Sequence, residues 1–211
     1  MYTLHPRGSD ASTRIMENTE ETSEVPAQLS CWRIRAASPG DIPAILQLIK
    51  DLAVYEKEPE SVVEINEQVL QKDCFGEERW FECLVAEEYD KNHLKPEGTK
   101  SSTPMPSHHH RVVGYALYFH AYSTWQGRML FLEDIFVTPK SRGQGIGKTF
   151  LKELAKIAIH KGCCKIKWHV LDWNKLAINF YDSIGTDIEG EWRLCCLGTT
   201  AMMELSGKAG N

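Results

Sequence analysis

The chain has 211 residues, a formal net charge of −5 at neutral pH and 42% hydrophobic residues. This length suits one domain, and the apolar fraction lets most of it enclose a core. Because the net charge is negative, neither nucleic acid nor an anionic membrane is expected as a partner, whereas a cationic partner is compatible. No apolar run approaches the roughly 20 residues of a membrane-spanning helix. Residues 1–10 lack the apolar stretch of a secretory signal.

Cysteine usage bears on the compartment. The chain has seven cysteines, an odd number, with two adjacent pairs and no C-x-x-C spacing of the kind that zinc and redox sites use. We therefore expect reduced, mostly buried thiols in a cytoplasmic protein. The run His108–His110 lies among Ser and Pro residues without ligand spacing, so no metal site is expected.

Composition divides the chain into three parts. Residues 1–30 are rich in Ser, Thr, Glu and Pro and show no periodicity, which predicts a disordered N-terminal extension. A domain is predicted across 31–206, and residues 207–211 form a short C-terminal tail. Inside the domain, residues 89–111 are polar and contain several prolines, so a long mobile loop is expected there.

The first half of the domain is predicted to contain a strand, two helices and a strand. From Cys31, apolar residues alternate with arginines, as they do along a strand. A helix with apolar residues at helical spacing follows, with its cap at Ser38 or Asp41. A second short helix is expected across 64–72, and a strand across 81–87.

Strands and helices alternate in the second half. The middle strands, 112–121 and 129–137, are joined by a short turn and predict an antiparallel meander. Each later helix lies between two strands, which requires crossover connections and hence some parallel pairing. We therefore expect an α/β (α+β) fold with a mixed central sheet of about six or seven strands and helices on both faces. The remaining expected elements are a helix from residue 146 that ends near Gly162, a strand at 166–171, a helix at 175–183, and strands at 192–197 and 200–205.

A glycine-rich turn joins the strand at 129–137 to the helix that begins near residue 146. It reads Arg142-Gly-Gln-Gly-Ile-Gly-Lys148. Such a turn leaves several backbone N–H groups pointing at one place beyond the helix start, where a partial positive charge favours a phosphate. Arg142 and Lys148 can add charge-assisted contacts.

The spacing of the glycines narrows the choice of phosphate ligand. The phosphate-loop pattern needs Gly at position 142 and the dinucleotide pattern needs Gly at position 148, and neither is present. The pattern [Q/R]-x-x-G-x-[G/A] is met by Arg142, Gly145 and Gly147. It resembles the GNAT superfamily of N-acetyltransferases, in which this turn binds the pyrophosphate of coenzyme A. A plain glycine-rich connection is the alternative interpretation.

Further segments strengthen the resemblance. Together with the glycine turn, Tyr122–Arg128, Leu132–Asp134, Val170–Asn174 and Asn179–Tyr181 are similar to the spermidine/spermine (diamine) N-acetyltransferases, particularly to the branch named for thialysine. The similarity extends over about residues 32–206. It implies acetyl transfer from acetyl-CoA to a small cationic amine, a split or bulged central strand, and a homodimer whose site is completed by both subunits.

The resemblance also implies roles for individual residues. Tyr181 would be the general acid that protonates the departing thiolate, and Glu133 would be the base, acting through water. The amine site would comprise Tyr55, Glu56, Trp125, Glu133, Asp134, Lys167, Trp168 and His169. The acetyl-CoA site would comprise Ile135, Phe136, Val137, Arg142, Gly143, Gln144, Gly145, Ile146, Gly147, Lys148, Asn174, Lys175, Leu176, Ala177 and Ser183.

General chemistry agrees with these roles. An ammonium group must lose a proton before it can attack a thioester, and a carboxylate can bind the cation and then relay that proton. A tyrosine with a pKa near 10 is a suitable acid toward a thiolate whose thiol has a pKa near 8.5. Glu133 and Asp134 would face opposite sides of a regular strand. Both can serve one site only if a β-bulge lies near residues 133–135.

Each candidate also has a structural interpretation. Tyr181 could be a core aromatic, and Glu133 could pair with Arg128. Trp125 and Trp173 could be packing residues, and His169 and His120 are expected to be packed or partly exposed rather than catalytic. Two further functions stay open: acetylation of a lysine on a protein, and a CoA-binding regulatory role with little catalysis.

Ser123 stands beside the expected amine site where an acidic residue would favour polycations. This predicts weak use of spermine and better use of lysine-like thioethers or small diamines.

Overall fold

The computed structural model describes residues 30–90 and 110–207. Its centre is a five-stranded sheet in the order β1-β2-β3-β4-β5, in which β1 to β4 are antiparallel neighbours and β5 runs parallel to β4. The predicted N-terminal extension, the middle of the 89–111 loop and the last four residues of the predicted tail lie outside the described residues. The strands are β1 (Ser30–Ala36), β2 (Glu82–Asp90), β3 (His110–Ser123), β4 (Gly127–Val137) and β5 (Lys165–Lys167).

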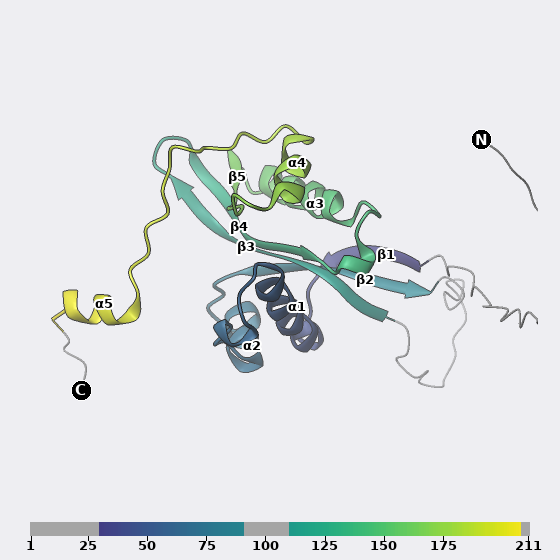
Figure 1. Ribbon diagram of the computed structural model, residues 1–211, viewed down its shortest axis with the longest axis horizontal. Coiled ribbons are helices and arrows are strands. Elements are labelled where there is room, and N and C mark those ends of the chain that lie inside the picture. Colours follow the sequence, from purple (N-terminus) through teal and green to yellow (C-terminus); the bar gives the residue numbers. More distant parts are fainter. Residues whose placement is uncertain (1–29, 91–109, 208–211) are drawn as a thin grey trace, which may run out of the picture.

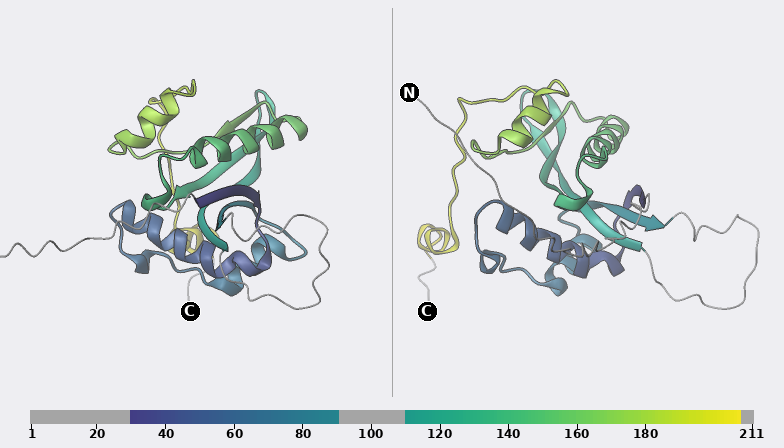
Figure 2. Two further views of the ribbon diagram at one scale, coloured as in Figure 1. Left: turned by 90° about the vertical axis from the view of Figure 1, so that its right-hand side faces the viewer. Right: turned by 45° about the vertical axis from the view of Figure 1, so that its right-hand side comes forward.

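Helices cover both faces of this sheet, as Figure 1 and the turned views of Figure 2 show. α1 (Ile42–Tyr55) and α2 (Glu67–Phe75) lie on one face, and α3 (Ile146–His160) and α4 (Lys175–Asp182) lie on the other. Short 3-10 turns precede α1 at Pro39–Asp41, follow it at Glu60–Val62, and precede the glycine turn at Pro139–Ser141. The expected mixed sheet between two helical layers is confirmed.

Each face of the sheet has its own core. On the α1 face, Ile45 and Leu48 pack with Val85 of β2, Tyr115 of β3 and Phe136 of β4. The core on the α3 face is larger, because α3 presents a full apolar stripe to the sheet. Its buried members include Ala116, Leu130, Leu132, Ile146, Phe150, Leu154, Ala158 and Tyr181.

Element boundaries in the first half agree with the sequence to within a few residues. The α1 helix begins directly after Asp41, whose carboxylate accepts hydrogen bonds from the Ser38 backbone and hydroxyl rather than capping a helical N–H. The second helix starts later than expected because Asn66 caps it by accepting from the Val69 N–H. β2 and β3 extend into both ends of the segment expected to be a loop.

Three expected strands in the second half are wrong in whole or in part. The strand expected at 166–171 is only β5, because from Trp168 onward the chain leaves β4 and lines a cavity instead. The segment 192–197 has no regular structure; it is exposed throughout, and among the described residues no strand edge pairs with it. Residues 200–205 belong to a helix, α5 (Thr199–Leu205), since Ala, Met, Glu and Leu favour helix. The described sheet therefore has five strands, fewer than expected.

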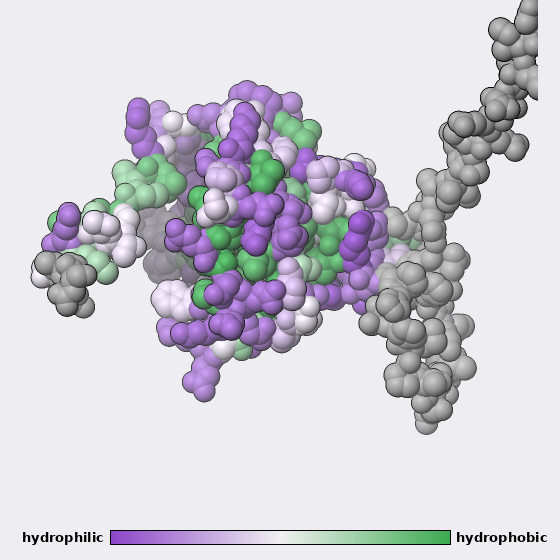
Figure 3. All heavy atoms as spheres, turned by 60° about the horizontal axis from the view of Figure 1, so that its bottom comes forward, coloured by the Kyte–Doolittle hydropathy of each residue, from purple (hydrophilic) through white to green (hydrophobic). Residues whose placement is uncertain are grey.

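The end of the chain stands apart from the domain. After α4 the chain runs along the domain and then outward to α5, which projects from it in Figures 1 and 2. Figure 3 shows the same projection with apolar residues on its surface. Residues Ile188, Trp192, Leu194, Leu197, Met202, Met203 and Leu205 are all exposed apolar side chains on this C-terminal arm, residues 186–207.

Two further expectations concern the whole chain. Among residues 30–90 and 110–207, no helix combines the length and apolar character that crossing a membrane requires. All seven cysteines are free, but the expectation that most are buried is wrong. Only Cys74 and Cys83 are buried, and two of the others, Cys195 and Cys196, lie on the exposed arm.

Candidate active site

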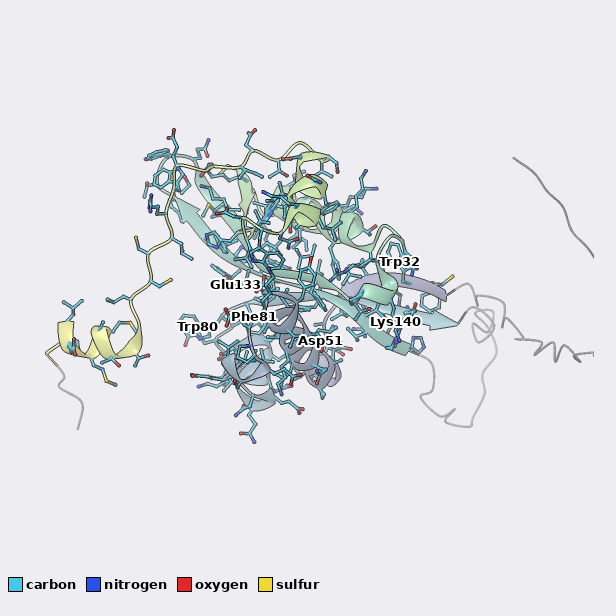
Figure 4. All side chains as sticks on the ribbon, viewed as in Figure 1. Trp32, Asp51, Trp80, Phe81, Glu133 and Lys140 are labelled. Atoms are coloured by element: carbon cyan, nitrogen blue, oxygen red, sulfur yellow. The ribbon has the colours of Figure 1, made fainter. Side chains whose placement is uncertain are left out.

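A large cavity opens where the two helical layers approach the middle of β4. Its volume is about 830 Å³, within the range of cavities that hold a ligand of drug or cofactor size. Its walls come from the end of α1, from β4 between Leu132 and Val137, from the glycine turn, from the segment 168–171 and from α4. Figure 4 labels Glu133 in this region, between the helical layers.

Most of the residues expected in the site line this cavity. On the acetyl-CoA side they are Ile135, Phe136, Val137, Arg142, Gly143, Gly145, Ile146, Gly147, Lys148, Asn174, Leu176, Ala177 and Ser183. On the amine side they are Tyr55, Glu56, Glu133, Asp134, Trp168 and His169, and the expected acid Tyr181 joins them. The structure thus brings together residues from positions 55 to 183.

Four expected residues lie outside the cavity walls. Trp125, at the tip of the β3–β4 hairpin, is 84% exposed, and Gln144 and Lys175 are exposed as well. Lys167 forms an ion pair with Glu189, with the ammonium nitrogen 2.8 Å from Glu189 Oε2. Gln144, Lys167 and Lys175 each neighbour a lining residue in the sequence, so spacing could not show that their side chains face away from the cavity.

The glycine turn is shaped to receive an anion. Gly143 and Gly145 have φ angles of 78° and 84°, which side-chain-bearing residues rarely adopt. A Cβ atom at either position would meet open space, so the turn borders the cavity rather than packing against protein. Gly145 is the N-cap of α3 and offers no side chain to its first turn. The N–H groups of residues 146–148 therefore remain available for a ligand.

Arg142 points away from the helix start. Its Nε donates to the carbonyl oxygen of Val137 at 2.9 Å, and its guanidinium lies 4.6 Å from the ring centroid of Tyr55 and 5.5 Å from that of Phe136. These contacts hold the side chain against β4 and the end of α1. For Arg142 to contact an anion at the glycine turn, as the sequence predicted, its side chain must rotate toward the backbone N–H groups of that turn.

A second set of contacts joins the two helical layers. The Tyr55 hydroxyl donates to Asn174 Oδ1 at 3.2 Å, and the same oxygen accepts from the Ala177 N–H at the start of α4. Trp173 does not line the cavity. Its ring centroid lies 6.0 Å from that of Tyr55, and the Lys57 ammonium nitrogen lies 4.1 Å from the Trp173 ring centroid. Tyr55 is therefore held from both sides at the rim of the cavity.

The predicted bulge in β4 is present. Leu117 of β3 pairs with Asp134 and the next residue, Tyr118, pairs with Leu132, so Glu133 is the extra residue. The bulge reverses the alternation: Leu132 and Ile135 both pack on the α3 face. Glu133 and Asp134 therefore lie together on the opposite side and both line the cavity.

Acidic groups gather beside this bulge. Burial, followed by the charge of Glu133, raises the pKa of Asp134, against a hydrogen bond from Tyr115 that lowers it. Burial also raises the pKa of Glu56, and the charges of Asp134 and Glu58 add to this effect. Among the described residues no ion pair joins Glu133 to Arg128, the alternative considered from sequence. The cluster is an unpaired negative site suited to a cation.

Tyr181 is buried at the opposite wall. Its ring packs edge-on against Trp168, with centroids 5.2 Å apart, and only 6% of the residue is exposed. Burial raises the pKa of Tyr181 to about 12, so the phenol keeps its proton at neutral pH. His169 packs edge-on against Phe131, while His120 is half-exposed and pairs with Glu82.

Sequence reasoning missed two features of the cavity. Tyr115, which donates a hydrogen bond to Asp134, had no motif around it and was indistinguishable from any other strand aromatic. Leu194, from the C-terminal arm, also lines the cavity. The described residues hold no group of three or more His, Cys, Asp or Glu that could bind a metal, and positions 108 and 109 lie outside them.

Fold and cavity together define the class: an α+β ligand-binding domain whose cavity lies at the start of a helix and beside a bulged strand. The family model described as "Acetyltransferase (GNAT) family" matches residues 64–185. The chain therefore belongs to the GNAT acetyltransferase family, as the sequence motifs predicted.

Relatives agree with this assignment. The chain is 44% identical to a thialysine N-epsilon-acetyltransferase of Bos taurus, over 83% of this chain and 97% of that protein. It is 36% identical to a human spermidine/spermine N(1)-acetyltransferase-like protein 1, over 83% of this chain and 24% of that protein. Among solved structures, an integron cassette protein of V. cholerae superposes with a TM-score of 0.60 at 22% identity. That match covers 83% of this chain and 97% of the other and concerns the fold alone.

Proposed function

We propose that the protein transfers the acetyl group of acetyl-CoA to a primary amine of a small cationic acceptor, such as thialysine or a short diamine. One observation carries the proposal: a single cavity joins an uncapped helix start, suited to a diphosphate, to an unpaired cluster of acids, suited to an ammonium group. The names of the relatives, thialysine and spermidine/spermine acetyltransferases, support this acceptor class.

The cofactor end would bind acetyl-CoA through the backbone. The N–H groups of residues 146–148 would hold the diphosphate, with Lys148 adding a charge at the same place. β5 pairs with β4 only over Met129–Phe131, which leaves the β4 backbone at residues 135–137 free on that side for the pantetheine arm. In this proposal the divergence of the two strands is the split expected from the family.

The acceptor end would bind the ammonium group. Glu56, Glu133 and Asp134 line the cavity from α1 and β4, and Tyr55 closes its rim. A cation among these acids would relieve their mutual repulsion and would favour the ionised forms of Glu56 and Asp134, whose pKa values are raised. The same acids can take the proton that the amine must lose, with Glu133, the more exposed of the two at the bulge, acting through water.

Acetyl-CoA supplies an activated acetyl thioester, whose carbonyl carbon forms the new bond to the amine nitrogen as its bond to sulphur breaks. Tyr181 would give its hydroxyl proton to the departing sulphur. Its raised pKa means that it holds this proton until a basic group approaches. The edge-on contact with Trp168 would keep the phenol in place during the transfer.

A homodimer forms part of the proposal. Seven apolar side chains of the C-terminal arm, among them Trp192 and Leu197, are exposed, and clustered exposed apolar side chains commonly mark an interaction surface. Trp125, expected at the amine site, is exposed on a hairpin tip of this chain. A second copy that covers the arm would account for both.

The free cysteines support a cytoplasmic location, where thiols stay reduced.

The proposal is tested by measuring CoA release with acetyl-CoA and a panel of acceptors: thialysine, lysine, 1,3-diaminopropane, spermidine, spermine and a lysine-containing peptide. We expect thialysine and the short diamine to give the highest kcat/KM. From sequence, Ser123 was expected beside the amine site, where a further carboxylate would favour a second ammonium group, so spermine should be a weak acceptor. In the structure Ser123 is the last residue of β3 and does not line the cavity of its own chain. A higher kcat/KM for spermine than for thialysine would contradict the acceptor class.

Two other outcomes would replace the proposal. Preference for the peptide over every small amine would indicate a protein acetyltransferase. CoA binding by calorimetry without turnover of any acceptor would indicate a regulatory CoA-binding protein.

A further inference from the structure

Two buried tyrosines of β3 each donate a hydrogen bond to a carboxylate. The Tyr115 hydroxyl lies 2.9 Å from Asp134 Oδ2, and the Tyr118 hydroxyl lies 3.2 Å from Glu82 Oε2. Tyr115 is 0% exposed and Tyr118 is 3% exposed. The two carboxylates differ in place, because Asp134 lines the cavity and Glu82 does not. The strand therefore contains a hydroxyl that reaches the site and a near-equivalent one that does not.

The surroundings of Asp134 make its charge costly. Glu133 precedes it on the same strand, Glu56 lies near it at the end of α1, and Cys83 lies near it on β2. Each of these groups is neutral or negative. Within residues 30–90 and 110–207, Tyr115 is the residue whose side chain donates a hydrogen bond to this carboxylate, and no ion pair reaches it. The Tyr115 hydroxyl is thus the local stabiliser of the ionised form.

Packing alone does not require this hydroxyl. The Tyr115 ring lies in the α1-face core with Ile45, Leu48 and Phe136, where an apolar ring of the same size would fill the space. A buried hydroxyl is tolerated in such a core only when it has a partner. Asp134 is that partner, and the bulge at Glu133 brings it to this face.

We propose that Tyr115 is a positioning residue of acetyl transfer, which holds Oδ2 of Asp134 so that the ionised carboxylate presents Oδ1 to the acceptor's ammonium group. This inference rests on the proposed function. It concerns how the acceptor site is kept charged, and it assigns no chemical step to Tyr115 itself.

The ionisation balance gives the inference a measurable consequence. Burial and Glu133 raise the pKa of Asp134, and the Tyr115 hydrogen bond opposes them. Removing the hydroxyl would raise that pKa further, so a higher pH would be needed to ionise Asp134. Activity that depends on ionised Asp134 would then be lost at the acidic side of the pH profile and recovered at higher pH.

The experiment compares Tyr115→Phe with the wild type and with Tyr118→Phe, a matched loss of a buried hydroxyl outside the cavity. The measurement is kcat/KM for thialysine between about pH 6 and pH 10. For Tyr115→Phe we expect the acidic limb of the pH profile to move to higher pH by about one unit. Loss of a hydrogen bond to a charged group changes the pKa of that group by about this amount. At a pH on that limb, kcat/KM should fall about tenfold through the acceptor KM, with the acetyl-CoA KM unchanged.

Tyr118→Phe should leave the limb where it is. Superimposable profiles for Tyr115→Phe and wild type would overturn the inference, and so would an equal displacement in Tyr118→Phe. If Tyr115→Phe does not fold, Asp134→Asn replaces it. That variant should raise the acceptor KM at every pH, and an unchanged acceptor KM would overturn the inference. A wild type that acetylates no amine defeats the proposed function and this inference together, whereas an active wild type with unaltered variants defeats the inference alone.

Discussion

Two clusters of acidic side chains in this domain have opposite surroundings. In the cavity, Glu56 and Asp134 have raised pKa values because burial and neighbouring acids oppose their charge. At the other end of the sheet, burial also opposes the charge of Asp41 and Glu87, but arginines outweigh it and lower both pKa values. Burial is common to the two clusters, so the presence of a cation decides whether the pKa values of the acids are raised or lowered.

The paired cluster is built into the structure of β1 and β2. Arg35 donates to both Asp41 oxygens at 2.7 and 2.8 Å and to Glu87 at 3.0 Å, while Arg33 reaches Glu87 at 2.6 Å. Only 7% of Asp41 and 6% of Glu87 are exposed. Among residues 30–90 and 110–207, no arginine or lysine forms an ion pair with the cavity acids Glu56, Glu133 and Asp134. An acid cluster completed by its own arginines stabilises the fold, whereas one left incomplete at a cavity is suited to a ligand.

Changes at the cavity should affect activity, and changes at the arginine-paired cluster should affect stability. The largest effect is expected for Tyr181→Phe at the cavity. Without the hydroxyl, the departing sulphur loses the proton donor that we propose for it, so kcat should fall about 10²- to 10⁴-fold. CoA affinity by calorimetry and the urea midpoint should stay near the wild-type values. A kcat within threefold of wild type would mean that another group, or water, provides the proton.

A smaller effect, on stability rather than rate, is expected for Asp41→Ala. It removes two hydrogen bonds from Arg35 and those from Ser38, and the free energy of unfolding should fall by about 3 kcal/mol. Urea unfolding measures this change. Asp51→Ala on the exposed side of α1, where only Gln47 donates to the carboxylate, is the control and should cost less than about 0.5 kcal/mol. Equal losses in both variants would show that the arginine network contributes nothing.

The smallest expected effect is the acid dependence of stability. Hydrogen bonds from Arg35 and Ser38 outweigh burial and lower the pKa of Asp41 to about 2, from an unfolded value of about 4. Its contribution of about 2 kcal/mol is therefore complete above pH 4 and is lost as the pH falls toward 2. Unfolding free energies measured from pH 5 to pH 2 should decline for the wild type. The decline should be shallower in Asp41→Ala, and parallel curves would contradict the assignment.

Patterns close together in the sequence predicted most of the domain. The helical spacing of apolar residues located α1 and α3, and the glycines at 143, 145 and 147 located the turn that begins α3. The bulge at Glu133 followed from two adjacent acids that both needed one face. Such features depend on residues that are close together in the sequence, so a short sequence pattern is sufficient to predict them.

Features that depend on distant partners were not accessible in the same way. A strand was expected at 192–197, yet a strand forms only where another strand edge pairs with it, and the described fold has no such edge there. The Tyr115–Asp134 hydrogen bond joins positions 19 residues apart on opposite sides of a hairpin, and Tyr55 meets Asn174 across 119 residues.

For this protein, local sequence was therefore sufficient for the order of elements up to the helix α4, for the glycine-rich turn and for the family. The tertiary structure decided which acids stay unpaired, which tyrosine supports them and which expected residues face away. The physical reason is that the pKa and the hydrogen bonds of a side chain depend on all the groups packed around it. Residues distant in the sequence come together only when the chain folds.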